Sequence, residues 1–309
     1  VFDSDVWGHY CMITVMGKER SKFFSMERNK KIQIAVVGVF LIANIIIWFA
    51  VFRADSRGNL TVAFLDVGQG DAIYIEAPNG NQVLVDGGPG RQVLRELGHV
   101  MPFYDRSLDV ILSTHPDQDH VGGLPPVLER MDISNIVTTE NTSNTGAYGA
   151  FEEAIIKERA KRTLARAGER IILDDGVVLE ILFPDRNAYG WETNTSSIVA
   201  RLTYGEKSFL LTGDSPIAVE KYLVGTYGGD LKTTVLKLGH HGSRTSSSRE
   251  YISAVDPEYA IISAGLNNKY GHPHKEVVAL LKELGIPGMN TAESGTIIFK
   301  TDGEELHLK

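Results

Sequence analysis

The chain has 309 residues, 43% of them hydrophobic, and a formal net charge of −8. An acidic chain of this kind is not a generic nucleic-acid clamp, because affinity for phosphates needs clustered Lys and Arg, although a local basic groove or bound metal ions can still receive a phosphate. Cys11 is the only cysteine, which excludes a disulfide within the chain.

The N-terminal region holds one candidate membrane span. Residues 32–52 form an uncharged apolar run, which at about 1.5 Å per residue matches the roughly 30 Å hydrocarbon core of a bilayer. Basic residues precede it, so the positive-inside rule predicts a cytoplasmic tail over residues 1–31 and an extracytoplasmic C-terminal part. We interpret the run as a single-pass signal anchor; a buried core helix and a cleaved signal peptide are the alternatives. Residues 1–25 are interpreted as upstream read-through or a short native tail, because Met26 resembles a natural start.

From residue 60 onward, short β-like runs alternate with helical ones, which predicts one α/β domain over residues 60–309 with two sheets and outer helices. Asn79-Gly80 between two of these runs is a strong hairpin signal. The predicted strands cover residues 60–67, 72–78, 81–88, 108–114, 135–140, 176–184, 196–204, 207–214, 233–243, 258–265, 295–300 and 304–309. The predicted helices cover residues 91–101, 125–131, 149–167, 216–228 and 274–285.

The segment HPDQDH, residues 115–120, carries the densest group of reactive side chains. It supplies His115, Asp117, Asp119 and His120 directly after an apolar strand. Imidazole nitrogens and carboxylate oxygens are the ligands that a pair of divalent cations needs, and such a pair can make hydroxide from water at neutral pH. The alternative is a charged loop that caps the strand, with both aspartates near a helix N-terminus.

Four further predicted strands end in residues of the same types or are followed by them. These residues are Asp86, Asp214, His240 with His241, and His272 with His274. Ligand sites in open α/β sheets form beyond the carboxyl ends of strands. We therefore expect the five strand ends to converge on one site.

Four of these residues have a second interpretation. Asp86 either touches a metal or holds its Gly-Gly turn by hydrogen bonds, and Asp214 either bridges two cations or caps the next helix. His240 and His241 cannot easily point the same way from an extended backbone. One of them is expected to bind metal, and the other to be buried, to bind substrate or to donate a proton.

Three other residues also have two possible roles each. His272 lies between Gly271 and Pro273 in a constrained loop. We expect it to be a metal ligand or an acid catalyst. His274 precedes a helix and either takes part in catalysis or only caps that helix. Asn194 either reaches the site or makes a turn.

Six segments together resemble one known family. They are LDVGQGDA (65–72), VLVDGG (83–88), STHPDQDHVGG (113–123), NTSSIVARLTYGEKSFLLTGD (194–214), LKLGHHGS (236–243) and KYGHPH (269–274). In this order they are similar to the metallo-β-lactamase superfamily, and more narrowly to its ComEC-like competence branch, which acts in DNA internalisation. The resemblance covers nearly all of residues 60–309. It implies an αββα sandwich, two mixed sheets with outer helices, that holds two metal ions at one edge.

The resemblance also implies a ligand set. One metal would be held by His115, Asp117 and His240, the other by Asp119, His120 and His272, and both by Asp214. Asp117 stands where the broader family pattern His-x-His-x-Asp-His has a histidine, and Asn194 lies where another is often found. Both departures make the site richer in oxygen, so the expected cofactors are two divalent ions, Zn²⁺ or Mn²⁺.

The implied catalytic roles follow from this ligand set. Water between the metals would be the nucleophile next to Asp119, and His241 or His274 would protonate the leaving oxygen. Asn194 and Ser243 would contact the substrate. Asp71 and Asp86 would support the ligands without touching a metal.

These inferences describe a membrane-anchored hydrolase outside the bacterial cytoplasmic membrane, with its N-terminus inside. We expect a dinuclear phosphodiesterase or nuclease that uses metal-bound hydroxide; its expected partners are the membrane, a phosphodiester such as single-stranded DNA, and a membrane or competence-system protein. The alternatives are a hydrolase of the same fold that acts on another ester, a lactone or an amide, and a non-catalytic metal-binding scaffold. Members of the family that transport DNA carry a large polytopic membrane domain. With one candidate span, this chain is expected to be a tethered hydrolase or part of a split system.

Overall fold

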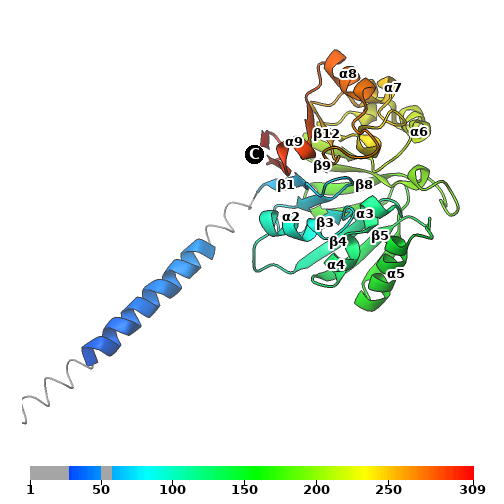
Figure 1. Ribbon diagram of the computed structural model, residues 1–309. Helices are drawn as coiled ribbons and strands as arrows, with labels where there is room; N and C mark the ends of the chain where they lie inside the picture. Colours follow the sequence, from blue (N-terminus) through cyan, green and yellow to red (C-terminus); the bar gives the residue numbers. More distant parts are fainter. Residues whose placement is uncertain (1–27, 50–57) are drawn as a thin grey trace, which may run out of the picture. The chain divides into compact units, whose positions relative to one another are not determined.

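The computed structural model describes residues 28–49 and 58–309 (Figure 1). The chain divides into two compact units, Val1–Asp55 and Ser56–Lys309. The expected start at Met26, the tail 1–25 and the last three residues of the expected anchor lie outside the described residues.

A single helix, Arg28–Phe49, makes up the described part of the first unit. Its 22 residues at about 1.5 Å each reach the thickness of a bilayer core, so by length and composition it can cross a membrane. Its apolar side chains are exposed, as Phe40 is at 66%, which is typical of a membrane helix rather than of a buried core helix.

The second unit contains two mixed sheets, and the first has eight strands in the spatial order β15-β14-β1-β2-β3-β4-β5-β6. Their bounds are β1 (Leu60–Phe64), β2 (Ile73–Glu76), β3 (Gln82–Val85), β4 (Ser107–Ser113), β5 (Asp132–Thr138), β6 (Lys161–Leu164), β14 (Ile297–Thr301) and β15 (Leu306–Leu308). Strands β3 to β6 run parallel, and the other neighbours pair antiparallel. The β2–β3 hairpin turns at Asn79-Gly80 as predicted, with Gly80 at φ 94°.

The second sheet has seven strands in the order β13-β12-β11-β10-β9-β8-β7. Their bounds are β7 (Arg170–Asp174), β8 (Val177–Phe183), β9 (Val199–Tyr204), β10 (Lys207–Leu211), β11 (Val235–Lys237), β12 (Tyr259–Ile262) and β13 (Gly288–Asn290). Strands β7 to β10 pair antiparallel, and β10 to β13 run parallel.

Alternate residues along the strands pack in different layers. On β1, Val62 and Phe64 pack in the core between the sheets, and Ala63 packs in the core under the helices. The first sheet is covered by α2 (Gln92–Val100), α3 (Gln118–Val121), α4 (Leu124–Leu128) and α5 (Gly146–Glu158). The second is covered by α6 (Ile217–Tyr227), α7 (Arg249–Val255) and α8 (Lys275–Glu283), on the opposite side of the molecule (Figure 1). The predicted αββα sandwich is confirmed.

The predicted helix 149–167 is wrong in its second half. Helix α5 ends at Glu158, where Arg159 adopts a left-handed backbone with φ 61°. Strand β6 follows and pairs in parallel with β5, so the chain leaves the helix and extends the first sheet by one strand. The sequence also does not reveal the short elements β7, β13, α7 and α9 (Thr291–Ser294).

Phe299 of β14 connects the two sheets through ring packing. Its ring centroid lies 6.2 Å from that of Phe64 in the first sheet and 6.0 Å from that of Phe209 in the second, in edge-to-face geometries. All three side chains are fully buried. Their packing is therefore a central part of the core that holds the sheets together.

Replacing Phe299 with alanine is expected to lower the free energy of unfolding by about 3–5 kcal/mol, because the change removes buried area and leaves a cavity. Urea denaturation followed by circular dichroism measures this loss. Phe103→Ala removes a ring that is 85% exposed and serves as the matched control, with an expected change within about 0.5 kcal/mol. Equal losses in the two variants would contradict the packing described.

Candidate metal centre

Residues from both sheets meet beyond the carboxyl ends of parallel strands. Strands β3 and β4 lead to Asp86 and to the segment 115–120, and strands β10 and β11 lead to Asp214 and to His240-His241. The two sheets present these ends at one edge of the sandwich, so that residues far apart in the sequence lie within a few ångströms of one another.

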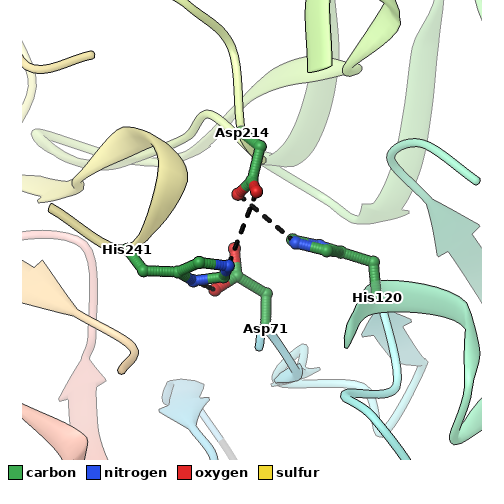
Figure 2. Close-up of side chains that lie close together, drawn as sticks. All are labelled: Asp71, His120, Asp214 and His241. Carbon is green, nitrogen blue, oxygen red and sulfur yellow. Dashed lines mark ion pairs between the residues drawn. The ribbon is translucent and has the colours of Figure 1, made fainter. Parts of the chain in front are cut away.

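Asp214 lies at the centre of this group. Four imidazole Nε2 atoms surround its carboxylate: that of His120 at 3.3 Å, His241 at 3.5 Å, His240 at 3.7 Å and His115 at 3.9 Å. Figure 2 shows Asp214 facing His120 and His241. Burial alone would raise the pKa of Asp214, but the neighbouring imidazoles, His241 foremost, outweigh it and hold this pKa well below its usual value.

The local backbone decides between two interpretations of the sequence. Helix α6 begins after Pro216, which occupies the N-cap position, so Asp214 does not cap this helix. His240 and His241 have left-handed backbones, with φ 49° and 57°, where an extended strand was expected. Because the chain turns at this pair, both side chains reach Asp214, and the expectation that they point apart is wrong.

Two buried carboxylates contact the Nδ1 atoms of two of the imidazoles, on the side away from Asp214. Asp86 Oδ2 lies 2.8 Å from His120 Nδ1 and also accepts the hydroxyl of Thr114 at 2.7 Å. Asp71 Oδ1 lies 3.3 Å from His241 Nδ1. With Nδ1 directed to a carboxylate, each ring turns its Nε2 toward the centre, which is the arrangement typical of metal-binding histidines.

Hydroxyl groups contact the Nδ1 atoms of the other two imidazoles. Thr114 Oγ1 lies 3.0 Å from His115 Nδ1, and Thr245 Oγ1 lies 3.2 Å from His240 Nδ1. All four rings therefore have a polar partner at Nδ1 and direct Nε2 to the same carboxylate.

A buried lysine completes the group. Lys237 is fully buried, and its Nζ lies 2.7 Å from Asp71 Oδ2 and donates to the carbonyl of Leu238 at 2.9 Å. Burial would raise the pKa of Asp71, but Lys237 and His241 outweigh it and lower this pKa. Lys237 was not anticipated from the sequence, although a lysine inside the apolar run of β11 is an unusual signal.

Asp117 and Asp119 lie nearer to solvent, with side chains 35% and 30% exposed. Asp117 Oδ2 lies 3.7 Å from His115 Nε2, and Asp119 Oδ2 lies 3.2 Å from His241 Nε2. Thr193 donates its hydroxyl to Asp117 at 3.1 Å. The two carboxylates thus border the buried imidazoles at the side that solvent can reach.

His272 and His274 lie beside this group. The ring of His272 is 5.3 Å from that of His240, and its Nδ1 is buried with no hydrogen-bond partner among the described residues. Burial and the nearby histidines, His241 first, lower the pKa of His272 to about 4, so it is neutral at pH 7. His274 holds the N-cap position of α8, but its side chain does not cap the helix; its Nδ1 accepts the backbone N–H of Arg244 at 3.1 Å.

The two expected substrate contacts differ in how they are placed. Asn194 begins a short 3-10 helix, Asn194–Ser196, and its buried Oδ1 has no partner among the described residues. Ser243 Oγ lies 3.0 Å from the Thr245 hydroxyl and accepts the Thr245 N–H at 3.3 Å. Ser243 is therefore engaged within its own loop, whereas the oxygen of Asn194 is available.

The donor set fits divalent cations. The atoms His115 Nε2, His120 Nε2 and Asp214 Oδ1 are buried without a hydrogen-bond partner among the described residues, although such atoms are costly to leave unpaired. Asp71, His120, Asp214 and His241 each offer one ligand atom within 4.8 Å of the others (Figure 2). Burial disfavours an imidazolium, yet Asp214, Asp119 and Asp71 raise the pKa of His241 to about 9, which shows that the site favours positive charge.

Known proteins are similar to this chain in sequence or in fold. Residues 65–265 match the family model described as the metallo-beta-lactamase superfamily. ComE operon protein 3 of Bacillus subtilis (strain 168) is 30% identical over 298 residues, 89% of this chain and 37% of that protein. Competence protein ComA of Neisseria gonorrhoeae is 32% identical over 257 residues, 81% of this chain and 34% of that protein. The predicted resemblance is confirmed, and the chain spans about a third of the length of these relatives.

A solved structure agrees on the fold. The metallo-beta-lactamase fold protein YhfI from Bacillus subtilis aligns with a TM-score of 0.50 at 11% identity, over 74% of this chain and 95% of that chain. At this identity, the likeness concerns the fold alone.

Addition of Zn²⁺ or Mn²⁺ at about 100 times its Kd is expected to stabilise the native protein by about 2.7 kcal/mol and to raise Tm by about 5–10 °C. Differential scanning fluorimetry of the chelator-treated protein measures the shift. Asp214→Asn should abolish it, and Asp175→Asn, at an exposed position, should retain it. A full shift in the Asp214 variant would contradict the assignment of this centre.

Proposed function

Because the chain belongs to the metallo-β-lactamase superfamily, we propose that it is a dinuclear metal-dependent phosphodiesterase that cleaves nucleic acid. The observation that carries this proposal is the arrangement of four Nε2 atoms around Asp214, with Asp117 and Asp119 at its solvent side. Nitrogen and oxygen donors in this number suit two Zn²⁺ or Mn²⁺ ions better than one.

The donors divide into two sets that share Asp214. His115, Asp117 and His240 form the first set, since Asp117 Oδ2 lies 3.7 Å from His115 Nε2. Asp119, His120 and His241 form the second, since Asp119 Oδ2 lies 3.2 Å from His241 Nε2. His241 thus takes the place that the resemblance assigned to His272.

Asp71 supports His241 and does not itself bind a metal. One of its oxygens faces Lys237 Nζ at 2.7 Å and the other faces His241 Nδ1 at 3.3 Å. A cation at Asp71 would lie next to the buried ammonium, and like charges at that distance repel strongly. Asp86 has the same supporting role for His120.

The chain's own residues orient the substrate and move the protons. When bound, the two cations supply Lewis acidity and a water of lowered pKa. Asp119, at the solvent side, is placed to orient the attacking water and to accept its proton at an Oδ atom. His274 accepts the Arg244 N–H at Nδ1, which leaves its Nε2 as the atom that can donate a hydrogen bond to the leaving oxygen, while the proton for that oxygen comes from solvent. His272, whose pKa is lowered to about 4, packs next to His240 as a neutral ring.

The apolar helix supports a membrane-anchored enzyme. We assign residues 32–52 as a single-pass anchor and residues 60–309 as the hydrolase domain. The positive charges of Arg28, Lys30 and Lys31 favour a cytoplasmic N-terminus and an extracytoplasmic domain. The alignment with ComE operon protein 3 covers more of this chain than residues 60–309 alone, so it includes part of the N-terminal region. The name of competence protein ComA supports a competence system as partner, and we propose DNA as the substrate.

We expect the metal-loaded protein to cleave both a single-stranded oligonucleotide and bis-p-nitrophenyl phosphate, measured by gel electrophoresis and by nitrophenolate release. Asp214→Asn should lower kcat/KM by more than about 100-fold for both, because loss of a shared ligand costs more than the 10- to 100-fold typical of a supporting residue. Asp175→Asn is the control and should keep full activity. Two bound metals with no cleavage of either compound would move the assignment to another ester, a lactone or an amide.

Lys237→Met is expected to destabilise the protein by about 3–5 kcal/mol, because it leaves the Asp71 carboxylate buried without a cation. The double variant Lys237→Met/Asp71→Asn should recover part of this loss, since no buried charge then remains unpaired. The double variant should bind Zn²⁺ about 10- to 100-fold more weakly, because His241 loses the carboxylate that faces its Nδ1. Urea unfolding and competition with a chelator measure the two effects; unchanged affinity in the double variant would contradict the role of Asp71.

A further inference from the structure

The loop after β12 places an aromatic ring beside the candidate metal centre. Tyr270 is 52% exposed, and its ring centroid lies 5.7 Å from that of His272 with an interplanar angle of 21°. The ring of His272 lies 5.3 Å from that of His240, whose Nε2 is 3.7 Å from Asp214. A continuous series of contacts therefore connects an exposed tyrosine with the carboxylate at the centre of the site.

Asn268 holds this loop in one conformation. Its Nδ2 donates to the carbonyl oxygens of Gly265 at 2.9 Å and His272 at 2.5 Å. Its Oδ1 accepts the backbone N–H groups of Tyr270 at 3.1 Å and His272 at 3.0 Å. The Tyr270 ring is thus positioned before a ligand arrives, which reduces the entropy that binding costs.

Exposed basic residues lie near the Tyr270 ring. Lys269 Nζ lies 4.9 Å from the centroid of Tyr270, in a cation–π contact. Arg244 is exposed, and its backbone N–H bonds to His274 at the end of the same loop. An aromatic face next to positive charge is the combination that binds single-stranded nucleic acid, because bases stack on the ring and phosphates pair with the cations.

We propose that Tyr270 is a base-stacking subsite for single-stranded nucleic acid next to the scissile phosphodiester. The base takes the place of the Lys269 ammonium over the ring, and this ammonium then pairs with the flanking phosphate. The subsite accepts any base, since every base has a π face. It rests on the proposed function, because the strand reaches Tyr270 only when its phosphodiester lies at the metal centre.

The first test compares a thymidine oligonucleotide with an abasic oligonucleotide of the same length, so that the phosphates are identical. Tyr270→Ala should raise KM for the thymidine strand about 5- to 100-fold with little change in kcat, and should leave KM for the abasic strand unchanged. Tyr270→Phe should keep the wild-type KM, because it keeps the ring. Phe103→Ala removes an exposed ring from the loop before β4, at the other end of that strand from the site, and is the matched control.

The second test measures binding without turnover. In a protein carrying Asp119→Asn, a strand with 2-aminopurine should lose fluorescence on binding because the base stacks on Tyr270. The added change Tyr270→Ala should restore this fluorescence, and Tyr270→Phe should not.

The outcomes separate the two proposals. Normal cleavage of both strands by Tyr270→Ala overturns the subsite and leaves the phosphodiesterase in place. A loss in Tyr270→Phe as large as that in Tyr270→Ala also overturns stacking, because it assigns the effect to the hydroxyl. If the wild-type protein cleaves neither strand nor bis-p-nitrophenyl phosphate, the proposed function fails, and the fluorescence result alone decides whether Tyr270 stacks on a base.

Discussion

The candidate site depends on one buried carboxylate, that of Asp214, and on the four imidazoles that face it. An ionised carboxylate in a protein interior costs several kcal/mol unless opposite charges or hydrogen bonds compensate it. Neither sheet supplies that compensation alone: His115 and His120 follow a strand of the first sheet, and His240 and His241 follow a strand of the second. The two sheets are therefore joined at this edge by electrostatics, as they are joined in their core by apolar packing.

Further charged residues stabilise the imidazoles that surround Asp214. His241 lies between Asp71 and Asp119, and Asp71 in turn faces the buried ammonium of Lys237. Positive and negative groups thus alternate from Lys237 through Asp71 and His241 to Asp214. The same alternation fixes which imidazole nitrogen faces the centre. Charge pairing and ligand orientation are consequently one structural requirement.

Local signals predict an α/β domain with two sheets and the position of the site: apolar strands that end in Asp or His, and turn residues such as Asn79-Gly80. The αββα sandwich itself is what the family resemblance implies. The sequence does not predict that His240 and His241 point the same way, because their left-handed backbones depend on tertiary packing. A Cβ at neighbouring Gly242, for example, would lie 2.8 Å from Pro273 Cβ, a residue of a distant segment. Lys237 is missed for a similar reason: its partner, Asp71, lies far away in the sequence, in the loop between β1 and β2 of the other sheet.

The formal charge of −8 suggests a poor match to a polyanion, but this charge does not include the metals that the site accommodates. Asp71, Asp86 and Asp214 are buried, so these three carboxylates do not face an approaching strand, and Asp117 and Asp119 at the solvent side each lie next to an imidazole. Two divalent cations would halve the net charge and place the positive charge where the proposed phosphodiester substrate would bind. Lys269 and Arg244 extend this positive region along the surface. Local field rather than net charge therefore decides whether such a protein accepts nucleic acid.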